Sequence, residues 1–248
     1  MGFSWELPYC SQRMPILAEN VVATSQPLAA EAGLHALRKG GNAVDAALAT
    51  AIALTVVEPT SNGIGSDAFA IVWDGDRIHG LNASGRSPRA LSPEKFVGMA
   101  AMPTLGWDPV TVPGAVSAWV ALSKRFGRLP FAALFEDAIR YAREGYLVSP
   151  ITAAAWGRAA GRYAAFPAFG DTFLPHGRAP RPGECFRSPD HAATLETIAE
   201  TRGEAFYRGV LAEKIVAHAK ATGGLMTLED LAAHEAAWVT PISVGYRG

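Results

Sequence analysis

Arg86 is the residue of this chain whose type and surroundings best suit a chemical role. It lies in the loop Ala83-Ser-Gly-Arg-Ser-Pro88, bracketed by a glycine and a proline, so we expect its position to be fixed. A guanidinium held in this way can bind a carboxylate through two parallel hydrogen bonds. A surface salt bridge is the alternative for a single arginine. The residues alone leave both interpretations open.

Other residue patterns point away from nucleotide, metal and serine-nucleophile chemistry. Gly63-Ile-Gly65-Ser-Asp-Ala68 has the glycine spacing of a dinucleotide loop, but it follows a predicted helix and opens a predicted strand. Phosphate binding needs the reverse order, so we interpret this stretch as a tight turn. No serine stands in a G-x-S-x-G pattern. The six histidines are scattered without ligand spacing and Cys185 has no motif around it, so the sequence predicts no metal site and no cofactor.

Composition excludes several classes of partner. The 248 residues are 49% hydrophobic and 18% charged, which is typical of a globular protein with a sizeable core. A net charge of -1 gives no electrostatic case for nucleic acid or for an anionic membrane. Cys10 and Cys185 read as reduced thiols, although one disulfide between them stays open. The first ten residues lack the features of a signal peptide, and no stretch qualifies as a transmembrane helix, so we expect a cytoplasmic protein.

One long helix is expected to organise the rest of the chain. The stretch from Gly41 to Pro59 has Asn42 as an N-cap, Asp45 in its first turn and small or apolar side chains on nearly every face. The apolar run of this helix is too short to span a membrane, and it has the charged residue Asp45 near its start. The sequence therefore predicts a core helix that is buried all round.

The remaining elements follow from periodicity and from start and stop signals. Strands are predicted over 20–24, 68–73, 77–82 and 242–246, with 68–73 buried on both faces and joined to 77–82 by the turn Asp74-Gly75-Asp76. Helices are predicted over 27–39, 115–126, 130–143, 150–163, 189–201 and 210–222, with short helices from Ser92 and Thr227 and a long surface excursion over 166–189.

The chain resembles the γ-glutamyltranspeptidases, which are N-terminal nucleophile hydrolases. The most specific part of the resemblance is Gly40-Gly-Asn-Ala-Val-Asp-Ala-Ala47 with Val57-Glu-Pro59 at its proper distance. It extends over nearly the whole chain from Ile16. Further matching segments are Val21–Thr24 with Pro27–Ala29, Gly63–Gly65, Arg86–Pro88, Val112–Gly114, Gly127–Pro130, Ala205–Gly209, Gly223–Thr227 with Asp230-Leu231, and Tyr246–Gly248.

The resemblance implies an α+β fold, a four-layer αββα sandwich of which this chain supplies an incomplete, N-terminal part of the large subunit. Residues 1–19 would form an N-terminal arm and 20–248 a partial domain that continues beyond the chain end. It also implies a precursor that cleaves itself and exposes a threonine nucleophile, whose own α-amino group acts as base. No Thr-Thr pair of the expected junction occurs here, so we expect no catalytic residue in this chain.

The resemblance assigns a substrate contact to Arg86, which matches the arginine that holds the donor's carboxylate. Ser87 follows it, where transglutamylating members have glutamate, and we include Ser87 in the predicted substrate site. Gly65-Ser66-Asp67 also stands where those members have glycine only. The expected partners are a γ-glutamyl amide such as glutathione and the small subunit of the same precursor.

Three functions remain open at this stage. The first is a γ-glutamyltransferase or hydrolase. The second is an acylase that removes a glutaryl-type group, as from a cephalosporin, since that group keeps a carboxylate for Arg86. The third is a non-catalytic, degenerate module, because the nucleophile junction is missing.

Overall fold

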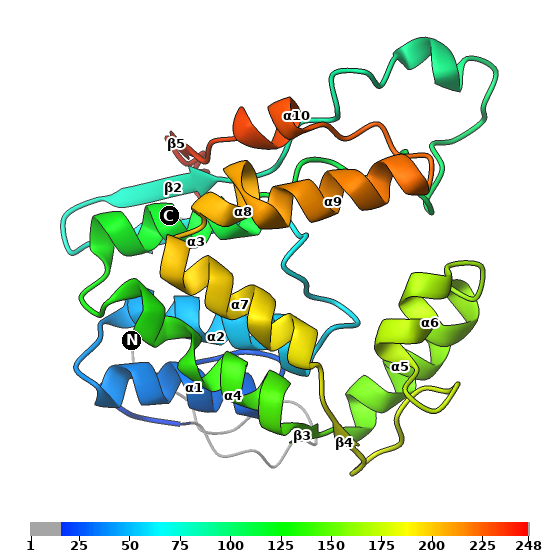
Figure 1. Cartoon of the computed structure of the whole chain (residues 1–248). Coiled ribbons are helices and arrows are strands. Elements are labelled where there is room, and N and C mark those ends of the chain that lie inside the picture. Colours follow the sequence, from blue (N-terminus) through cyan, green and yellow to red (C-terminus); the bar gives the residue numbers. More distant parts are fainter. Residues whose placement is uncertain (1–15, 248) are drawn as a thin grey trace.

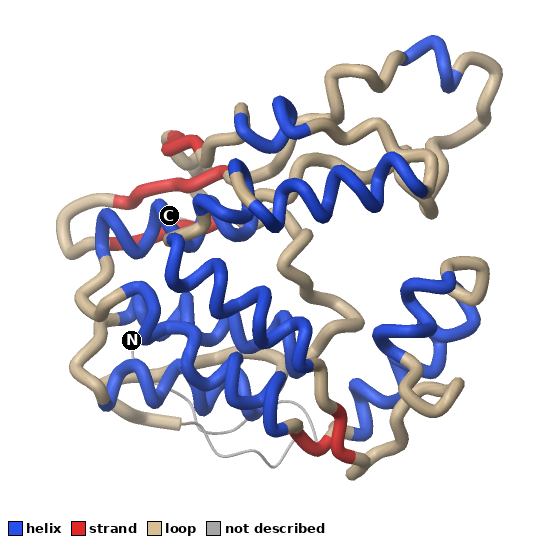
Figure 2. The backbone as a smooth tube through the Cα atoms, in the orientation of Figure 1, coloured by secondary structure: helices blue, strands red, loops and turns tan. Residues whose placement is uncertain are grey.

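The computed structural model describes residues 16–247, which form a helical body with a small sheet along one side (Figures 1 and 2). The predicted arm over 1–19 therefore falls mostly outside the described residues, as does Cys10. The α-helices span Pro27–Arg38 (α1), Ala43–Val57 (α2), Ala115–Phe126 (α3), Glu136–Glu144 (α4), Pro150–Arg162 (α5), Pro167–Phe173 (α6), Pro189–Thr201 (α7), Glu204–Arg208 (α8), Val210–Ala221 (α9) and Leu228–Ala232 (α10), and short 3₁₀ helices span Pro93–Phe96 (η1) and Phe131–Phe135 (η2).

Helix α2 lies in the core of the helical body, as predicted, but it is not buried all round, because Ala43 and Ala47 are exposed. It packs against α1, α3, α4 and η2, and Ile52, Ala53 and Val57 are fully buried. Its N-cap is Asn42, whose side-chain oxygen accepts from the amides of Val44 and Asp45 at 2.9 and 3.1 Å. Among the described residues, no helix combines the length and the apolar character that crossing a bilayer requires.

The carboxylate of Asp45 joins the start of α2 to the end of α3. Asp45 is wholly buried, and its Oδ2 accepts from the amides of Asn42 at 2.9 Å, Arg128 at 3.0 Å and Leu129 at 3.4 Å. In return, the side-chain amide of Asn42 donates to the carbonyl of Phe126 at 2.6 Å. Because this buried carboxylate is fully hydrogen-bonded, it holds the start of α2 and the end of α3 in a fixed position relative to each other.

The strands span Phe69–Trp73 (β1), Ile78–Asn82 (β2), Tyr146–Leu147 (β3), Cys185–Phe186 (β4) and Ala237–Val239 (β5). The larger sheet has the order β1-β2-β5 and is antiparallel throughout, with Ile71 opposite Gly80 and Leu81 opposite Trp238. The predicted turn between β1 and β2 is confirmed, and Gly75 has a φ of 101° there. Strands β3 and β4 form a separate pair at the base of α5 and α6 (Figure 1).

One face of the β1-β2-β5 sheet packs on α3. The ring of Phe126 lies 5.6 Å from that of Trp238 and 5.1 Å from that of His79, measured between centroids. Arg125 completes this layer, with its guanidinium 4.2 Å from the Trp238 ring and 2.9 Å from Nδ1 of His79. Helix α3 thus packs against the inner face of the sheet and supports it.

The other face of this sheet is open, and the prediction that strand 68–73 is buried on both faces is wrong for the described residues. Phe69, Ile71 and Trp73 are 68%, 75% and 62% exposed. They alternate with the inward residues Ala70 and Val72, as the period of a strand requires. Pro241 lies over Gly80 of β2, where a Cβ would stand 3.2 Å from its ring, but the outer side chains of β1 stay exposed, so the continuous apolar run is half exposed.

Other differences concern where strands and helices form. The predicted strands over 20–24 and 242–246 are irregular, and the strand after α10 is Ala237–Val239 instead. A β-branched run becomes a strand only beside a partner, and β2 pairs with 237–239. The predicted helix over 130–143 begins as the 3₁₀ helix η2 before α4, the excursion over 166–189 contains α6 and β4, and α8 was not predicted.

Replacing Asp45 tests the junction of α2 and α3. We expect Asp45→Ala to lower the free energy of unfolding by about 3 kcal/mol or more, because several buried amides lose a charged acceptor. Urea denaturation of the purified protein measures the change. Asp76→Ala, at an exposed position in the β1–β2 turn, is the matched control and should stay within about 0.5 kcal/mol of the unchanged protein. Equal midpoints for the two variants would contradict this role of Asp45.

Candidate functional site

The loop that carries Arg86 follows β2 and is held through its backbone at three points. The carbonyl of Arg86 accepts from the amide of Val112 at 2.9 Å. One residue earlier, the amide of Gly85 donates to Oδ1 of Asp67 at 3.2 Å. Farther on, the amide of Arg89 donates to Oδ1 of Asp230 at 3.1 Å, on α10. The predicted fixed position of this loop is therefore confirmed at the backbone.

Two glycines allow the segments 83–86 and 112–114 to lie backbone to backbone. A Cβ on Gly85 would stand 1.7 Å from the carbonyl oxygen of Val112, and a Cβ on Gly114 would stand 1.5 Å from that of Ala83. No side chain fits at either position, since both contacts are with backbone atoms. The Val112-Pro-Gly114 segment of the family resemblance thus serves to seat the Arg86 loop.

Arg86 and Ser87 themselves are not covered by this backbone support. Both residues are exposed, whereas Pro88 is buried. Within residues 16–247, the guanidinium of Arg86 makes no hydrogen bond or ion pair, and neither residue lines the two cavities described below. The surface salt bridge considered from the sequence is thus absent from the described part of the chain, and the assignment of both residues to a substrate site stays a prediction.

A polar cluster at the first turn of α3 lies beneath the loop. The hydroxyl of Tyr207 donates to the carbonyl of Pro113 at 2.8 Å and accepts from the amide of Ser117 at 3.0 Å, which caps a helix whose own N-cap is a glycine. The hydroxyl of Ser117 lies 2.9 Å from Nε2 of His234. Burial lowers the pKa of His234, while the charge of Asp67 opposes that shift. Burial also raises the pKa of Tyr207 to about 12, so its hydroxyl stays protonated.

Sequence reasoning missed this cluster. Tyr207 belongs to the matching segment Ala205–Gly209, so a signal for its importance was present. No pattern marks Ser117 or His234, because they meet only when α10 folds back over α3. Their contact depends on the tertiary structure, and no local sequence pattern predicts it.

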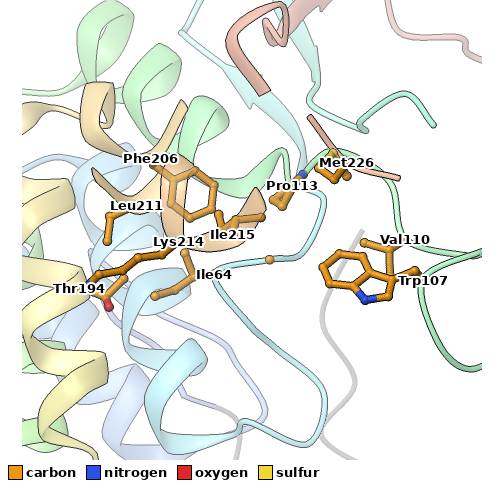
Figure 3. Close-up of a pocket in the computed structure, with 11 residues that line it drawn as sticks. Ile64, Trp107, Val110, Pro113, Thr194, Phe206, Leu211, Lys214, Ile215 and Met226 are labelled. Carbon is orange, nitrogen blue, oxygen red and sulfur yellow. The ribbon is translucent and has the colours of Figure 1, made fainter. Parts of the chain in front are cut away.

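An apolar cavity of about 390 Å³ lies between α9, α7 and the glycine-rich loop (Figure 3). The ring of Trp107 forms one wall and is fixed there, because its Nε1 donates to Thr222 at 2.7 Å and it lies against Gly224, where a Cβ would stand 2.6 Å from the ring. Lys214 is the only charged residue of the lining. The other lining residues are Ile64, Gly65, Val110, Pro113, Thr194, Phe206, Leu211, Ile215 and Met226. The cavity suits an apolar group and holds no acid–base pair.

A second, more polar cavity of about 650 Å³ adjoins the first and shares Ile64 and Thr194 with it. It lies at the N-terminus of α7 and is lined there by Asp190 and His191, with Asp171 of α6 on another side. Nε2 of His191 lies 3.4 Å from the hydroxyl of Thr55. Burial lowers the pKa of His191 to about 4, so its imidazole is neutral at pH 7.

The remaining candidates from the sequence gain no chemical role. Among residues 16–247, no cluster of three or more His, Cys, Asp and Glu side chains has the arrangement of a metal site. The glycine-rich loop over 60–67 leads into strand β1, and Ser66 closes a turn by donating its amide to the carbonyl of Gly63 at 3.1 Å. Cys185 is an exposed free thiol.

Comparison with known proteins matches this geometry to one family. The model of the gamma-glutamyltranspeptidase family matches residues 29–248. The chain is 38% identical to the glutathione hydrolase-like YwrD proenzyme of Bacillus subtilis over 233 residues, which are 93% of this chain and 44% of that protein. It is also 38% identical to the oxamate amidohydrolase proenzyme of Klebsiella pneumoniae over 229 residues, 89% of this chain and 43% of that protein.

The three-dimensional structure of the chain is also similar to a solved structure. The cephalosporin acylase of Bacillus halodurans superposes with a TM-score of 0.89 at 52% identity, over 100% of this chain and 48% of that one. This match confirms the predicted fold class, an incomplete portion of the N-terminal nucleophile hydrolase sandwich. The chain spans less than half the length of each of these three relatives.

Replacing Gly85 tests the close backbone contact beneath Arg86. We expect Gly85→Ala to destabilise the protein by about 2–4 kcal/mol, because the new Cβ would overlap the carbonyl of Val112. Thermal unfolding measures the loss. Gly157→Ala on α5, where a Cβ meets nothing within 4 Å, should raise stability by about 0.5–1 kcal/mol. A Gly85→Ala protein that melts like the Gly157→Ala protein would exclude the contact.

The lowered pKa of His191 predicts a pH dependence of stability. The unfolded chain binds more protons than the folded one between about pH 4 and the usual histidine pKa of 6.5, so stability falls as the pH drops through that window. From pH 7 to pH 5 we expect this group to account for a loss of about 1–2 kcal/mol. Urea midpoints at both pH values measure it. His191→Gln should reduce the loss, whereas the exposed His176→Gln should leave it as it is; an equal loss in both variants would rule out His191 as its source.

Proposed function

Because the chain belongs to the gamma-glutamyltranspeptidase family, we propose that it is the N-terminal part of a self-processing γ-glutamyltransferase or hydrolase. The substrate is an amide whose acyl group carries a carboxylate, such as glutathione. Three relatives support this class, since they are named for hydrolysing or deacylating glutathione, oxamate and cephalosporin. Each of these molecules contains both a carboxylate and an amide.

The proposal rests mainly on Arg86, whose backbone is fixed and whose guanidinium is unpaired among the described residues. Its backbone is fixed by Val112, while its exposed guanidinium has no partner among residues 16–247. A fixed, unneutralised guanidinium is suited to bind a carboxylate in bidentate geometry. Arg86 thus holds the donor's acid group, and Ser87 beside it can add a hydroxyl donor.

The reaction needs a nucleophile from polypeptide outside this chain. A threonine at a new N-terminus attacks the amide carbonyl, and its own α-amino group takes the hydroxyl proton. The C–N bond of the amide then breaks, and the amine leaves with that proton. The resulting acyl-threonine ester passes its acyl group to water or to another amine, which frees the threonine hydroxyl. Relatives named as proenzymes support a processed precursor, and the chain's share of under half their length leaves room for this part.

The open face of the β1-β2-β5 sheet supports the same partner. Phe69, Ile71 and Trp73 form an exposed apolar row, and such a row normally marks a surface that another element covers. In this proposal, the remainder of the same precursor packs there. A reducing, cytoplasmic location is also part of the proposal, supported by the free thiol of Cys185.

A glutaryl-type acylase is the second candidate. The 52% identity to a cephalosporin acylase favours it, and so does Ser87 in place of the glutamate of transglutamylating members. Both candidates place a carboxylate on Arg86 and differ in whether the donor also carries an α-amino group. A direct comparison of γ-glutamyl and glutaryl donors decides between them.

Replacing Arg86 in the full-length gene product tests the proposal. We expect Arg86→Ala to lower kcat/KM for γ-glutamyl anilide by about 30- to 100-fold, because one charge-assisted contact with the donor is lost. Arg86→Lys should recover only part of the loss, since an ammonium cannot bind a carboxylate through a planar fork. Release of the aniline from γ-glutamyl and glutaryl anilides measures both effects. Unchanged kinetics in Arg86→Ala, in a protein that still cleaves itself, would refute the assignment.

A further inference from the structure

We propose that Asp67 is a positioning residue for Arg86: its carboxylate holds the loop in the place where the guanidinium meets the donor's acid group. The inference rests on the proposed function of Arg86 and adds a residue that determines how the site binds. Asp67 was noted in the sequence only as a departure from a glycine-only run.

The contact that carries the inference extends the pairing of β1 and β2 beyond the strand ends, where the amide of Ala83 donates to the carbonyl of Ala68 at 3.0 Å. Oδ1 of Asp67 accepts the amide hydrogen of Gly85 at 3.2 Å, directly before Arg86. On the far side of Arg86, the backbone is held by Val112 at 2.9 Å. The arginine is thus held on both sides, by a carboxylate before it and by a backbone amide after it.

The backbone next to Asp67 is itself fixed by hydrogen bonds. The carbonyl of the preceding residue, Ser66, accepts from the amides of Gly114 and Ala115 at 3.0 and 2.8 Å, at the start of α3. Ser66 and Asp67 therefore link the start of α3 to the Arg86 loop, so the position of the loop depends on that of α3. A glycine at position 67 could not make the side-chain bond to Gly85, so this form of the loop depends on the aspartate.

The arrangement keeps the charge of Arg86 available. Asp67 and Arg86 form no ion pair within 4 Å in the described part of the chain, and the Oδ1 of Asp67 accepts from a backbone amide. An acid that paired directly with the guanidinium would compete with the substrate's carboxylate. Holding the loop through the amide of Gly85 fixes the arginine without neutralising it.

Two substitutions separate the hydrogen bond from the charge. Asp67→Ala removes both, whereas Asp67→Asn keeps an acceptor oxygen and removes the charge. Asp76→Ala, an exposed aspartate in the β1–β2 turn, is the matched control. The protein tested is the full-length gene product, with γ-glutamyl anilide and with the same anilide whose α-carboxylate has been converted to a primary amide.

We expect Asp67→Ala to raise KM for the carboxylate donor by about 10-fold with kcat within about twofold, because donor binding is weakened before the chemical step. KM for the neutral donor should not change, since that donor does not use the guanidinium. Asp67→Asn should restore KM to within about threefold of the unchanged enzyme. Asp76→Ala should match the unchanged enzyme, and melting temperatures show that each variant is folded.

Three results would overturn the inference. An unchanged KM in Asp67→Ala would show that the loop holds its position alone. Equal losses in Asp67→Asn and Asp67→Ala would show that the negative charge acts instead of the hydrogen bond. Equal losses with both donors would show a general structural role. Failure of the proposed function is recognised separately, because Arg86→Ala would then leave the KM of the carboxylate donor unchanged.

Discussion

The rest of the structure depends on one buried carboxylate, that of Asp45. It accepts backbone amides from its own helix and from the segment after α3, and no part of it reaches solvent. A buried charge of this kind tolerates little movement, because each lost hydrogen bond exposes its full desolvation cost. The position of α3 relative to α2 is therefore set at this point. The first turn of α3 in turn anchors Ser66, and through Asp67 it reaches Gly85 beside Arg86.

The motif residues that are most specific for the family serve folding rather than chemistry. Gly40 has a φ of 88°, and Gly41 lies where a Cβ would stand 2.7 Å from the carbonyl of Ala36. Glu58 at the other end of α2 accepts from the hydroxyl of Ser25 and from the side-chain amide of Asn62, which fixes the entry to the glycine-rich loop. These residues bring α1, α2 and that loop together, so their specificity reflects close packing.

The described residues leave two different surface groups without a partner, the outer side chains of β1 and the guanidinium of Arg86. Helix α3 covers the inner face of the sheet, while the outer face and the guanidinium of Arg86 are both exposed. An exposed apolar row and an unpaired charge have opposite preferences, since the row favours burial and the charge favours water or an anion. In the proposed function, the remainder of the precursor covers the row and the donor's carboxylate binds the charge.

The sequence by itself determined the elements whose signals are local. The caps at Asn42 and Thr227, the prolines that begin α1, α5 and α7, and the Asp74–Asp76 turn all fix backbone geometry within a few residues. The family resemblance also marks the interruption of the glycine run at Asp67, and it predicts a substrate contact for Arg86 that stays a prediction.

Only the tertiary structure decided which segments meet. The strand at 237–239 forms beside β2, whereas the predicted strand at 242–246 does not form. Ser117, Tyr207 and His234 meet although they are far apart in the chain, and one face of β1 stays exposed. Strand formation and burial depend on the neighbour that satisfies backbone and apolar groups, and that neighbour is not encoded in the local pattern. For the same reason, no local pattern indicated that the amides of Gly114 and Ala115, at the start of α3, donate to the carbonyl of Ser66 beside Asp67.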